Sequence, residues 1–140
     1  MRRGLTGALG TALAAGLIVV VPVALASNGG GNGGGGGGND RDVRAAGSCT
    51  LRSTAKIKLS PEDGGVEVEF EVDENRVGKT WSVVVNRNGS RVLSRKATTN
   101  ARSGSFEVRT VVGRGTPRTN VTAVARRAAT GEVCRASASI

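Results

Sequence analysis

The segment VEVEFEVD, residues 66–73, alternates apolar and acidic side chains without interruption. The segment CTLRSTAKIKL, residues 49–59, alternates in a similar way, with basic or hydroxyl side chains at its polar positions, and the sequence SPEDGG lies between the two. Alternation with period two is typical of a strand that buries one face, and Pro, Asp and Gly favour turns. The two segments therefore predict an antiparallel hairpin.

The charges of the two segments agree with this hairpin. If Leu59 pairs with Val66, three basic side chains on the first strand face acidic side chains on the second. The predicted pairs are Lys58 with Glu67, Lys56 with Glu69 and Arg52 with Asp73. Such cross-strand pairs each contribute roughly 0.2–1 kcal/mol, so the apolar and the charged patterns favour the same pairing.

Five further strands follow with shorter alternation, and each ends at a turn signal. They are expected at residues 80–87, 90–97, 106–112, 120–127 and 133–140. Asn88-Gly89 is typical of a two-residue hairpin turn; it would place Val92 inward and Arg91, Leu93 and Arg95 outward. Seven strands in about 93 residues predict an all-β fold, a small antiparallel β-sandwich with an immunoglobulin-like layout.

The two cysteines are expected to close this sandwich. Cys49 lies near the start of the first predicted strand and Cys134 lies within the last. An exported chain with an even number of cysteines should pair them. On the chain-entropy model, closing so long a loop contributes roughly 4–5 kcal/mol. The sequence therefore predicts one disulfide between the first and last strands.

The N-terminal third of the chain predicts export. Arg2 and Arg3 precede a long uncharged segment that ends in Ala24-Leu25-Ala26, a pattern typical of a secretory signal peptide at residues 1–26. The alternative is an uncleaved signal anchor, which would be the chain's one contact with a membrane. Residues 27–47 are rich in glycine and are expected to form a disordered linker before a sandwich domain at residues 48–140. The expected location is secreted, extracellular or associated with the cell wall.

Several segments resemble a known group of proteins. They are VEVEFEVD at 66–73 with Asn75-Arg76, Gly78 and Trp81, then Asn88-Gly89, GSFEV at 104–108 and ATGEVC at 129–134. Together they resemble small secreted proteins of unassigned function from high-GC Gram-positive bacteria, a resemblance that implies location and fold but no chemistry. The layout is also similar to immunoglobulin and fibronectin type III sandwiches, with Trp81 in the place of their third-strand core Trp. It departs from them in having no Tyr.

The composition argues against an enzyme. The chain has no His, which removes the usual general base and the most frequent metal ligand. The carboxylates of residues 67–73 follow the strand rise and are expected to form a salt-bridged face. The loop at residues 73–78 partly resembles a calcium loop, but Val84 stands where the closing Glu would be needed. We therefore expect no catalytic residue, no metal and no cofactor; with three aromatic side chains, nucleic acid is also not expected as a partner.

An uneven charge distribution suggests a partner. Residues 48–86 carry five basic and seven acidic side chains, whereas residues 87–140 carry eleven and two. The arginines expected to point outward from the second half are Arg91, Arg95, Arg126 and Arg135. They predict a binding face for an extracellular polyanion, such as a cell-wall polymer, or for an acidic extracellular protein. The alternative is that they only keep the domain soluble.

Two other functions fit the sequence. Residues 100–104 or 113–118 could form the exposed loop of a secreted protease inhibitor. Alternatively, an acidic sheet face could dock on a basic one and make the protein a self-associating structural component.

Overall fold

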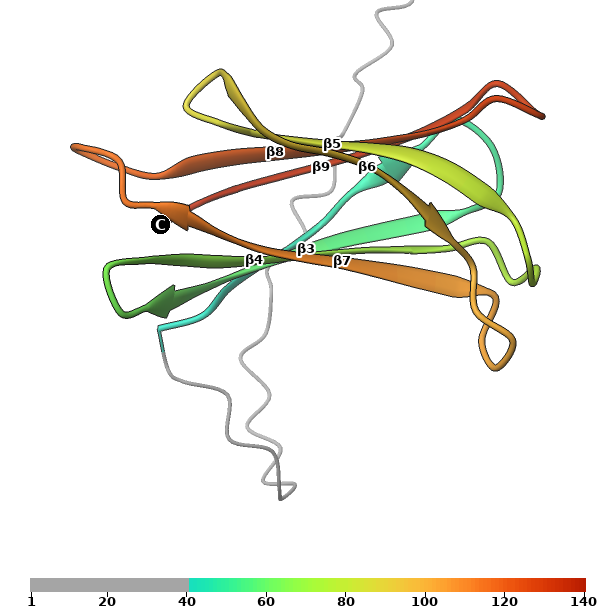
Figure 1. The fold of residues 1–140 in the computed structure, drawn as a ribbon, viewed down its shortest axis with the longest axis horizontal. Helices are drawn as coiled ribbons and strands as arrows, with labels where there is room; N and C mark the ends of the chain where they lie inside the picture. Colours follow the sequence, from blue (N-terminus) through green and yellow to red (C-terminus); the bar gives the residue numbers. More distant parts are fainter. Residues whose placement is uncertain (1–40) are drawn as a thin grey trace, which may run out of the picture. The chain divides into compact units, whose positions relative to one another are not determined.

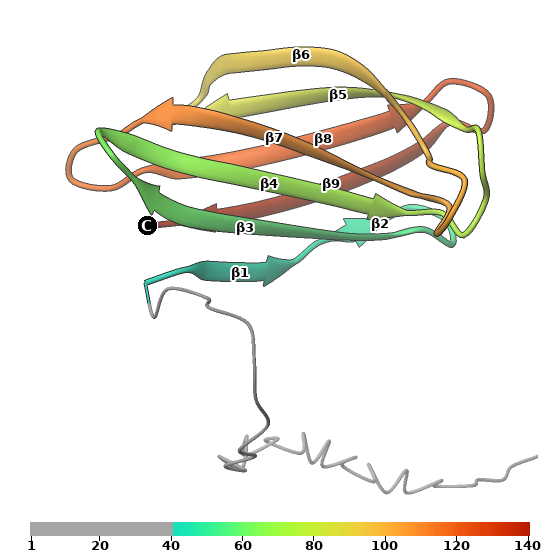
Figure 2. The ribbon, with the colours of Figure 1, turned by 60° about the horizontal axis from the view of Figure 1, so that its bottom comes forward.

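The computed structural model describes residues 41–140, so the predicted signal peptide and linker residues 27–40 lie outside the described part. The described residues form an all-β unit of nine strands in two antiparallel sheets (Figures 1 and 2). The strands are β1 (Val43–Ala46), β2 (Ser48–Cys49), β3 (Thr54–Glu62), β4 (Gly65–Asp73), β5 (Thr80–Arg87), β6 (Ser90–Thr98), β7 (Ser105–Gly113), β8 (Asn120–Arg127) and β9 (Glu132–Ser139).

The two sheets stack as the layers of a sandwich (Figure 1). One has four strands in the order β1-β3-β4-β7, and the other has five in the order β2-β9-β8-β5-β6. Alternate side chains from both sheets fill the space between them, as the period-two pattern predicts. The largest fully buried side chains are Trp81, Phe70, Ile57 and Leu59, and valines fill much of the remainder.

The first predicted hairpin is confirmed, but its register is different. Leu59 pairs with Val68 rather than with Val66. The strands continue to Glu62 and Gly65, because Gly64 has a φ of 75° and a two-residue turn is enough to connect them. A shift of two residues keeps every side chain on its predicted face. The opposite-charge pairs on that face become Lys58 with Glu69 and Lys56 with Glu71.

The segment predicted as one strand from Cys49 to Leu59 is divided between the two sheets. Ser48 and Cys49 pair with β9 in the five-stranded sheet, whereas β3 starts at Thr54 in the other. Leu51, expected in the core, lies in the connection between them and is 57% exposed. Alternation indicates one continuous strand only while the chain stays in one sheet, and this connection crosses between sheets.

The folded region also begins earlier than Ser48. Residues 43–46, expected in the linker, form β1 and pair with β3. Gly47 then lets the chain pass from one sheet to the other, because a Cβ at this position would lie 2.5 Å from the carbonyl oxygen of Arg135. With β1 and β2 added, the described residues contain nine strands rather than the predicted seven.

The second hairpin contains a bulge that reverses part of the prediction. Asn88-Gly89 forms the expected turn, with a positive φ at both residues. Between Val85 and Asn86 the register shifts by one residue, so that Val92 has no partner on β5. Leu93, predicted to point outward, packs against the core, and Val92, predicted to point inward, is 40% exposed. An extra residue in one strand inverts the alternation beyond it.

The predicted disulfide is confirmed. Cys49 and Cys134 are joined through sulfurs 2.05 Å apart, and the two residues are direct partners in the register of β2 and β9. The bond therefore lies at the edge of the five-stranded sheet and joins the second strand, rather than the first, to the last. Disulfides are typical of proteins in oxidising, non-cytoplasmic compartments.

A search of residues 41–140 for a helix with the length and hydropathy needed to cross a bilayer found none.

Removing the disulfide should destabilise the sandwich. In the double variant C49A/C134A, we expect the free energy of unfolding to fall by about 2–5 kcal/mol, because the unfolded chain loses a cross-link between distant residues. Urea unfolding followed by Trp81 fluorescence measures this. The neighbouring exposed Ser48→Ala serves as control and should change stability by less than about 0.5 kcal/mol. An unchanged midpoint in the double variant would contradict the expectation.

Two glycine positions should respond differently to alanine. Gly89 and Gly104 both have positive φ, but only at Gly104 would a Cβ collide with the backbone of Asn75 and Arg76. Gly89→Ala should cost about 1–2 kcal/mol, from backbone strain alone. Gly104→Ala should cost about 1–3 kcal/mol more, because the collision adds to the strain. Equal losses in thermal or urea unfolding would show that the loop around Gly104 adapts freely.

Candidate interaction surface

The outer face of the five-stranded sheet presents three rows of side chains across its strands. Trp81, Val83 and Val85 of β5 point inward, so the residues between them point outward. The register then defines the rows as Lys96-Ser82-Arg126-Val133, Ser94-Val84-Val124-Arg135-Ser48 and Arg91-Asn86-Thr122-Ser137. We call the surface made by these residues the cationic face.

The cationic face carries positive charge without a compensating carboxylate. Its four charged side chains, Arg91, Lys96, Arg126 and Arg135, are all exposed. None of the four makes a salt bridge with any residue in the described part of the chain. Val124, at the centre, points outward but is only 5% exposed, because its neighbours on the face cover it. Long basic side chains often cover apolar surface in this way and keep their charged ends in water.

The structure places three of the four sequence-predicted arginines on this face. Arg95 is the exception, because it pairs with Val83 and so lies on the opposite side of β6. The bulge at Val92 is the cause. Lys96 belongs to the face and was missed by the sequence analysis, and the alternation of β6 would have indicated it if the bulge had been recognised.

The outer face of the four-stranded sheet has a different character. Its carboxylates on β4 are joined to neighbouring cations as the sequence analysis expected: Glu71 to Lys56 at 3.0 Å, Glu69 to Lys58 at 3.2 Å and to Arg109 at 3.1 Å, and Glu67 to Arg109 at 3.5 Å. The hydrogen bond from Arg109 to Glu107, together with the charges of Glu107 and the β4 glutamates, raises the pKa of Arg109. Opposite charges on this face therefore compensate one another locally.

A charged cluster at the loop end of the sandwich was not predicted. The side chains of Glu74 and Arg127 are 6% and 11% exposed, and Oε1 of Glu74 lies 2.6 Å from an Nη of Arg127. Oε2 of Glu74 accepts a hydrogen bond of 3.1 Å from the indole N–H of Trp81. These residues come from the β4–β5 loop, β5 and the end of β8, and no short-range sequence pattern connects them. One carboxylate thus satisfies a buried indole and a nearly buried guanidinium.

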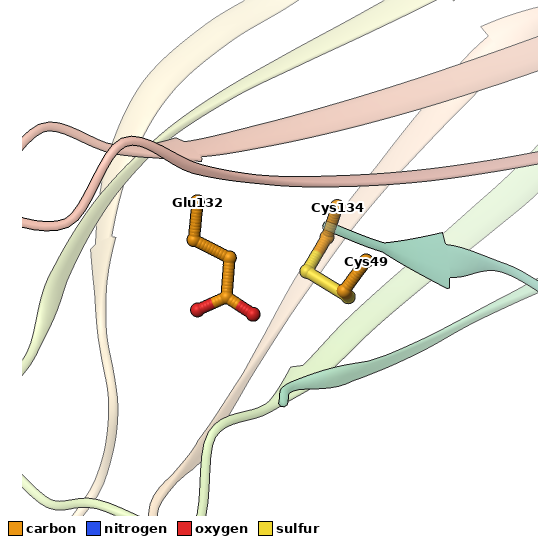
Figure 3. Close-up of side chains that lie close together, drawn as sticks. All are labelled: Cys49, Glu132 and Cys134. Carbon is orange, nitrogen blue, oxygen red and sulfur yellow. A yellow bond between two sulfur atoms is a disulfide. The ribbon is translucent and has the colours of Figure 1, made fainter. Parts of the chain in front are cut away.

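Two features of residues 41–140 resemble parts of metal sites. In the loop at residues 73–78, Oδ1 of Asp73 accepts a hydrogen bond of 2.8 Å from the N–H of Asn75, which has a φ of 55°. Among the described residues, one group of three potential ligands comes together, Cys49, Cys134 and Glu132 (Figure 3). Its two sulfurs are bonded to each other and are therefore not thiolates.

Comparison of the chain with protein-family models, with curated proteins and with solved structures found no match.

Replacing Glu74 should be far more costly than replacing an exposed glutamate. Glu74→Gln removes the charge opposite Arg127, and we expect the free energy of unfolding to fall by about 3–5 kcal/mol, because a nearly buried cation loses its partner. The matched control is Glu71→Gln, which breaks the more exposed pair with Lys56 and should cost less than about 1 kcal/mol. Urea unfolding of both variants tests this, and similar losses for the two would refute it.

Proposed function

We propose that this protein is a secreted, non-catalytic β-sandwich module that binds an extracellular polyanion through the cationic face. The observation that carries the proposal is the presence of four cations on one sheet face without any carboxylate in its three rows. The opposite outer face has a similar number of cations, but each of its β4 glutamates is paired with one. Of the two outer sheet faces, this one alone therefore carries uncompensated positive charge among the described residues.

The geometry of a sheet suits a linear anionic polymer. Neighbouring strands lie about 4.8 Å apart, and side chains on one face repeat about every 6.5–7 Å along a strand. The four cations lie on β6, β8 and β9, so that a polymer crossing the strands meets successive charges. Three of them are arginines, whose planar guanidinium groups bind phosphate and carboxylate through two parallel hydrogen bonds. Because each strand that carries a cation is hydrogen-bonded to at least one neighbouring strand, little ordering of the backbone is needed on binding.

The strand order supports an immunoglobulin-like layout of the fibronectin type III kind. When β3 to β9 are lettered A, B, C, C′, E, F and G, the sheets read A-B-E and C′-C-F-G, with β1 and β2 as additional edge strands. Sandwiches of this architecture are frequent in cell-surface proteins. This layout supports a role in binding at a surface, although fold alone does not define function.

The contacts of residues 100–104 and of the β4 carboxylates favour the cationic face over an inhibitor loop at 100–104 and over self-association. The turn at residues 100–104 is closed on itself, because Oδ1 of Asn100 accepts hydrogen bonds from the N–H groups of Arg102 and Ser103. An inhibitor loop must instead extend into the cleft of a protease. Self-association through an acidic face needs unpaired carboxylates, and those on β4 are paired with cations.

Binding of sodium polyphosphate to the full chain tests the proposal. The triple variant R91Q/R126Q/R135Q should bind about tenfold more weakly or worse, because three charge contacts are lost. Binding of the wild type should also weaken steeply between about 0.05 M and about 0.5 M NaCl, because salt screens exposed charges. Isothermal titration calorimetry measures both effects.

The matched control removes three arginines outside the cationic face, in the variant R95Q/R114Q/R118Q. It has the same net charge as the first variant, so a general effect of charge would weaken both equally. We expect the control to retain most of the wild-type affinity. Equal weakening of the two variants would show that net charge, and not this face, attracts the polymer.

A further inference from the structure

A separate cleft lies at the loop end of the sandwich, where the β2–β3 connection, the β4–β5 loop and the β8–β9 turn meet. Its volume is about 480 Å³, which lies within the range of small-molecule sites. Residues that line it include Arg52, Ser53, Glu74, Arg76, Arg127 and Glu132. None of these residues belongs to the cationic face, so the proposed binding of a polyanion does not account for the cleft.

The floor of the cleft contains a buried carboxylate without a cationic partner. Glu132 is 4% exposed, and its Oε1 accepts a hydrogen bond of 3.0 Å from the N–H of Ser53. Within residues 41–140 Glu132 forms no salt bridge, and its Oε2 forms no hydrogen bond but is not closed off from solvent. A carboxylate oxygen of Glu132 lies within 4.8 Å of both sulfurs of the neighbouring Cys49–Cys134 disulfide (Figure 3), which supplies no positive charge. A largely buried carboxylate without a cationic partner destabilises the fold unless a hydrogen-bond donor binds it.

Ser53 adds a second unsatisfied group to the same floor. Its side chain is buried, with 8% of the residue exposed, and its Oγ has no hydrogen-bond partner. Buried hydroxyl groups are nearly always paired in folded proteins, so each exception calls for an explanation. Here the unpaired hydroxyl and the unpaired carboxylate oxygen belong to residues already joined by a hydrogen bond.

None of the cations that line the cleft forms a salt bridge with Glu132. Arg127 is the register partner of Glu132, but its guanidinium binds Glu74 instead. Arg52 and Arg76 are both exposed and belong to the rim. A bare metal ion suits this cleft poorly, because it needs several oxygen ligands and these arginines repel it. A ligand that has both an ammonium group and an anionic group is complementary to this cleft. The ammonium group would pair with Glu132 at the floor, and the anionic group with Arg52 and Arg76 at the rim.

We propose that this cleft binds a small zwitterion, namely a short peptide with free termini. Its ammonium group donates to Oε2 of Glu132, and its carboxylate lies against Arg52 and Arg76. An ammonium group offers three donors, one for Oε2 of Glu132 and the others for water molecules in the cleft. This site is independent of the cationic face and of the proposed binding of polyanions.

The probe for this site is the dipeptide L-alanyl-L-alanine, titrated into the full chain and followed by amide chemical shifts in NMR. We expect shifts at Ser53, Arg76 and Glu132. The N-acetylated dipeptide, which has no ammonium group, should bind about tenfold more weakly, and the C-terminal amide should also bind more weakly. The double variant R52Q/R76Q should bind the dipeptide and its amide equally, because the rim no longer recognises the carboxylate.

The variants separate binding from folding. Glu132→Gln should abolish binding, but it also changes a buried group, so its fold is checked by near-ultraviolet circular dichroism. Arg52 and Arg76 are exposed, and R52Q/R76Q should fold as the wild type does. Arg135→Gln, on the cationic face, should leave dipeptide binding unchanged. The proposal is overturned if the dipeptide causes no shifts around the cleft, or if the acetylated form binds as well as the free one.

Discussion

The packing of two apolar sheet faces against each other is the constraint on which the other features depend. Each sheet places alternate side chains inward, and those side chains are mostly small, so the few large ones must fit closely. Trp81 is the largest of them and is fully buried, with its ring 6.0 Å from that of Phe106. Its indole N–H needs an acceptor, which Glu74 supplies, and the charge of Glu74 in turn needs Arg127. Packing in the core thus determines the polar network at the loop end.

The sequence predicted well those features that depend on local patterns. Alternation indicated the inward residues of β3, β4, β5 and β8, and Asn88-Gly89 indicated its turn, because both signals act between near neighbours. The pairing of Cys49 with Cys134 followed from cysteine count and expected location rather than from any pattern along the chain. The register of β3 and β4 was two residues off, because shifts by two preserve both the apolar and the charged faces and alternation cannot distinguish them.

The features that the sequence did not predict all need three-dimensional information. The crossing between β1 and β2 depends on Gly47 passing close to Arg135, which lies far away along the chain. The additional residue at Val92 inverts the alternation of β6. For this reason the sequence-based prediction assigned Arg95 to the wrong face and did not include Lys96. The contacts of Glu74 with Trp81 and Arg127, and of Glu132 with Ser53, join segments separated by up to 79 residues. Of the cationic face, the sequence indicated the excess of basic residues in the second half and three of its four cations, Arg91, Arg126 and Arg135.

Strand β6 forms one edge of the five-stranded sheet and is nine residues long, so one row of its backbone N–H and C=O groups has no neighbouring strand. Such an edge is a template for the addition of a strand from another molecule, and in many proteins it is the place where aggregation begins. Here Arg91, Arg95 and Lys96 extend from β6 on both sides of the sheet. A second copy that added its own β6 would bring three like charges against three. Because Arg95 and Lys96 are consecutive, positive charge lies on both sides of this edge, and repulsion between like charges opposes the growth of the protein into larger sheets.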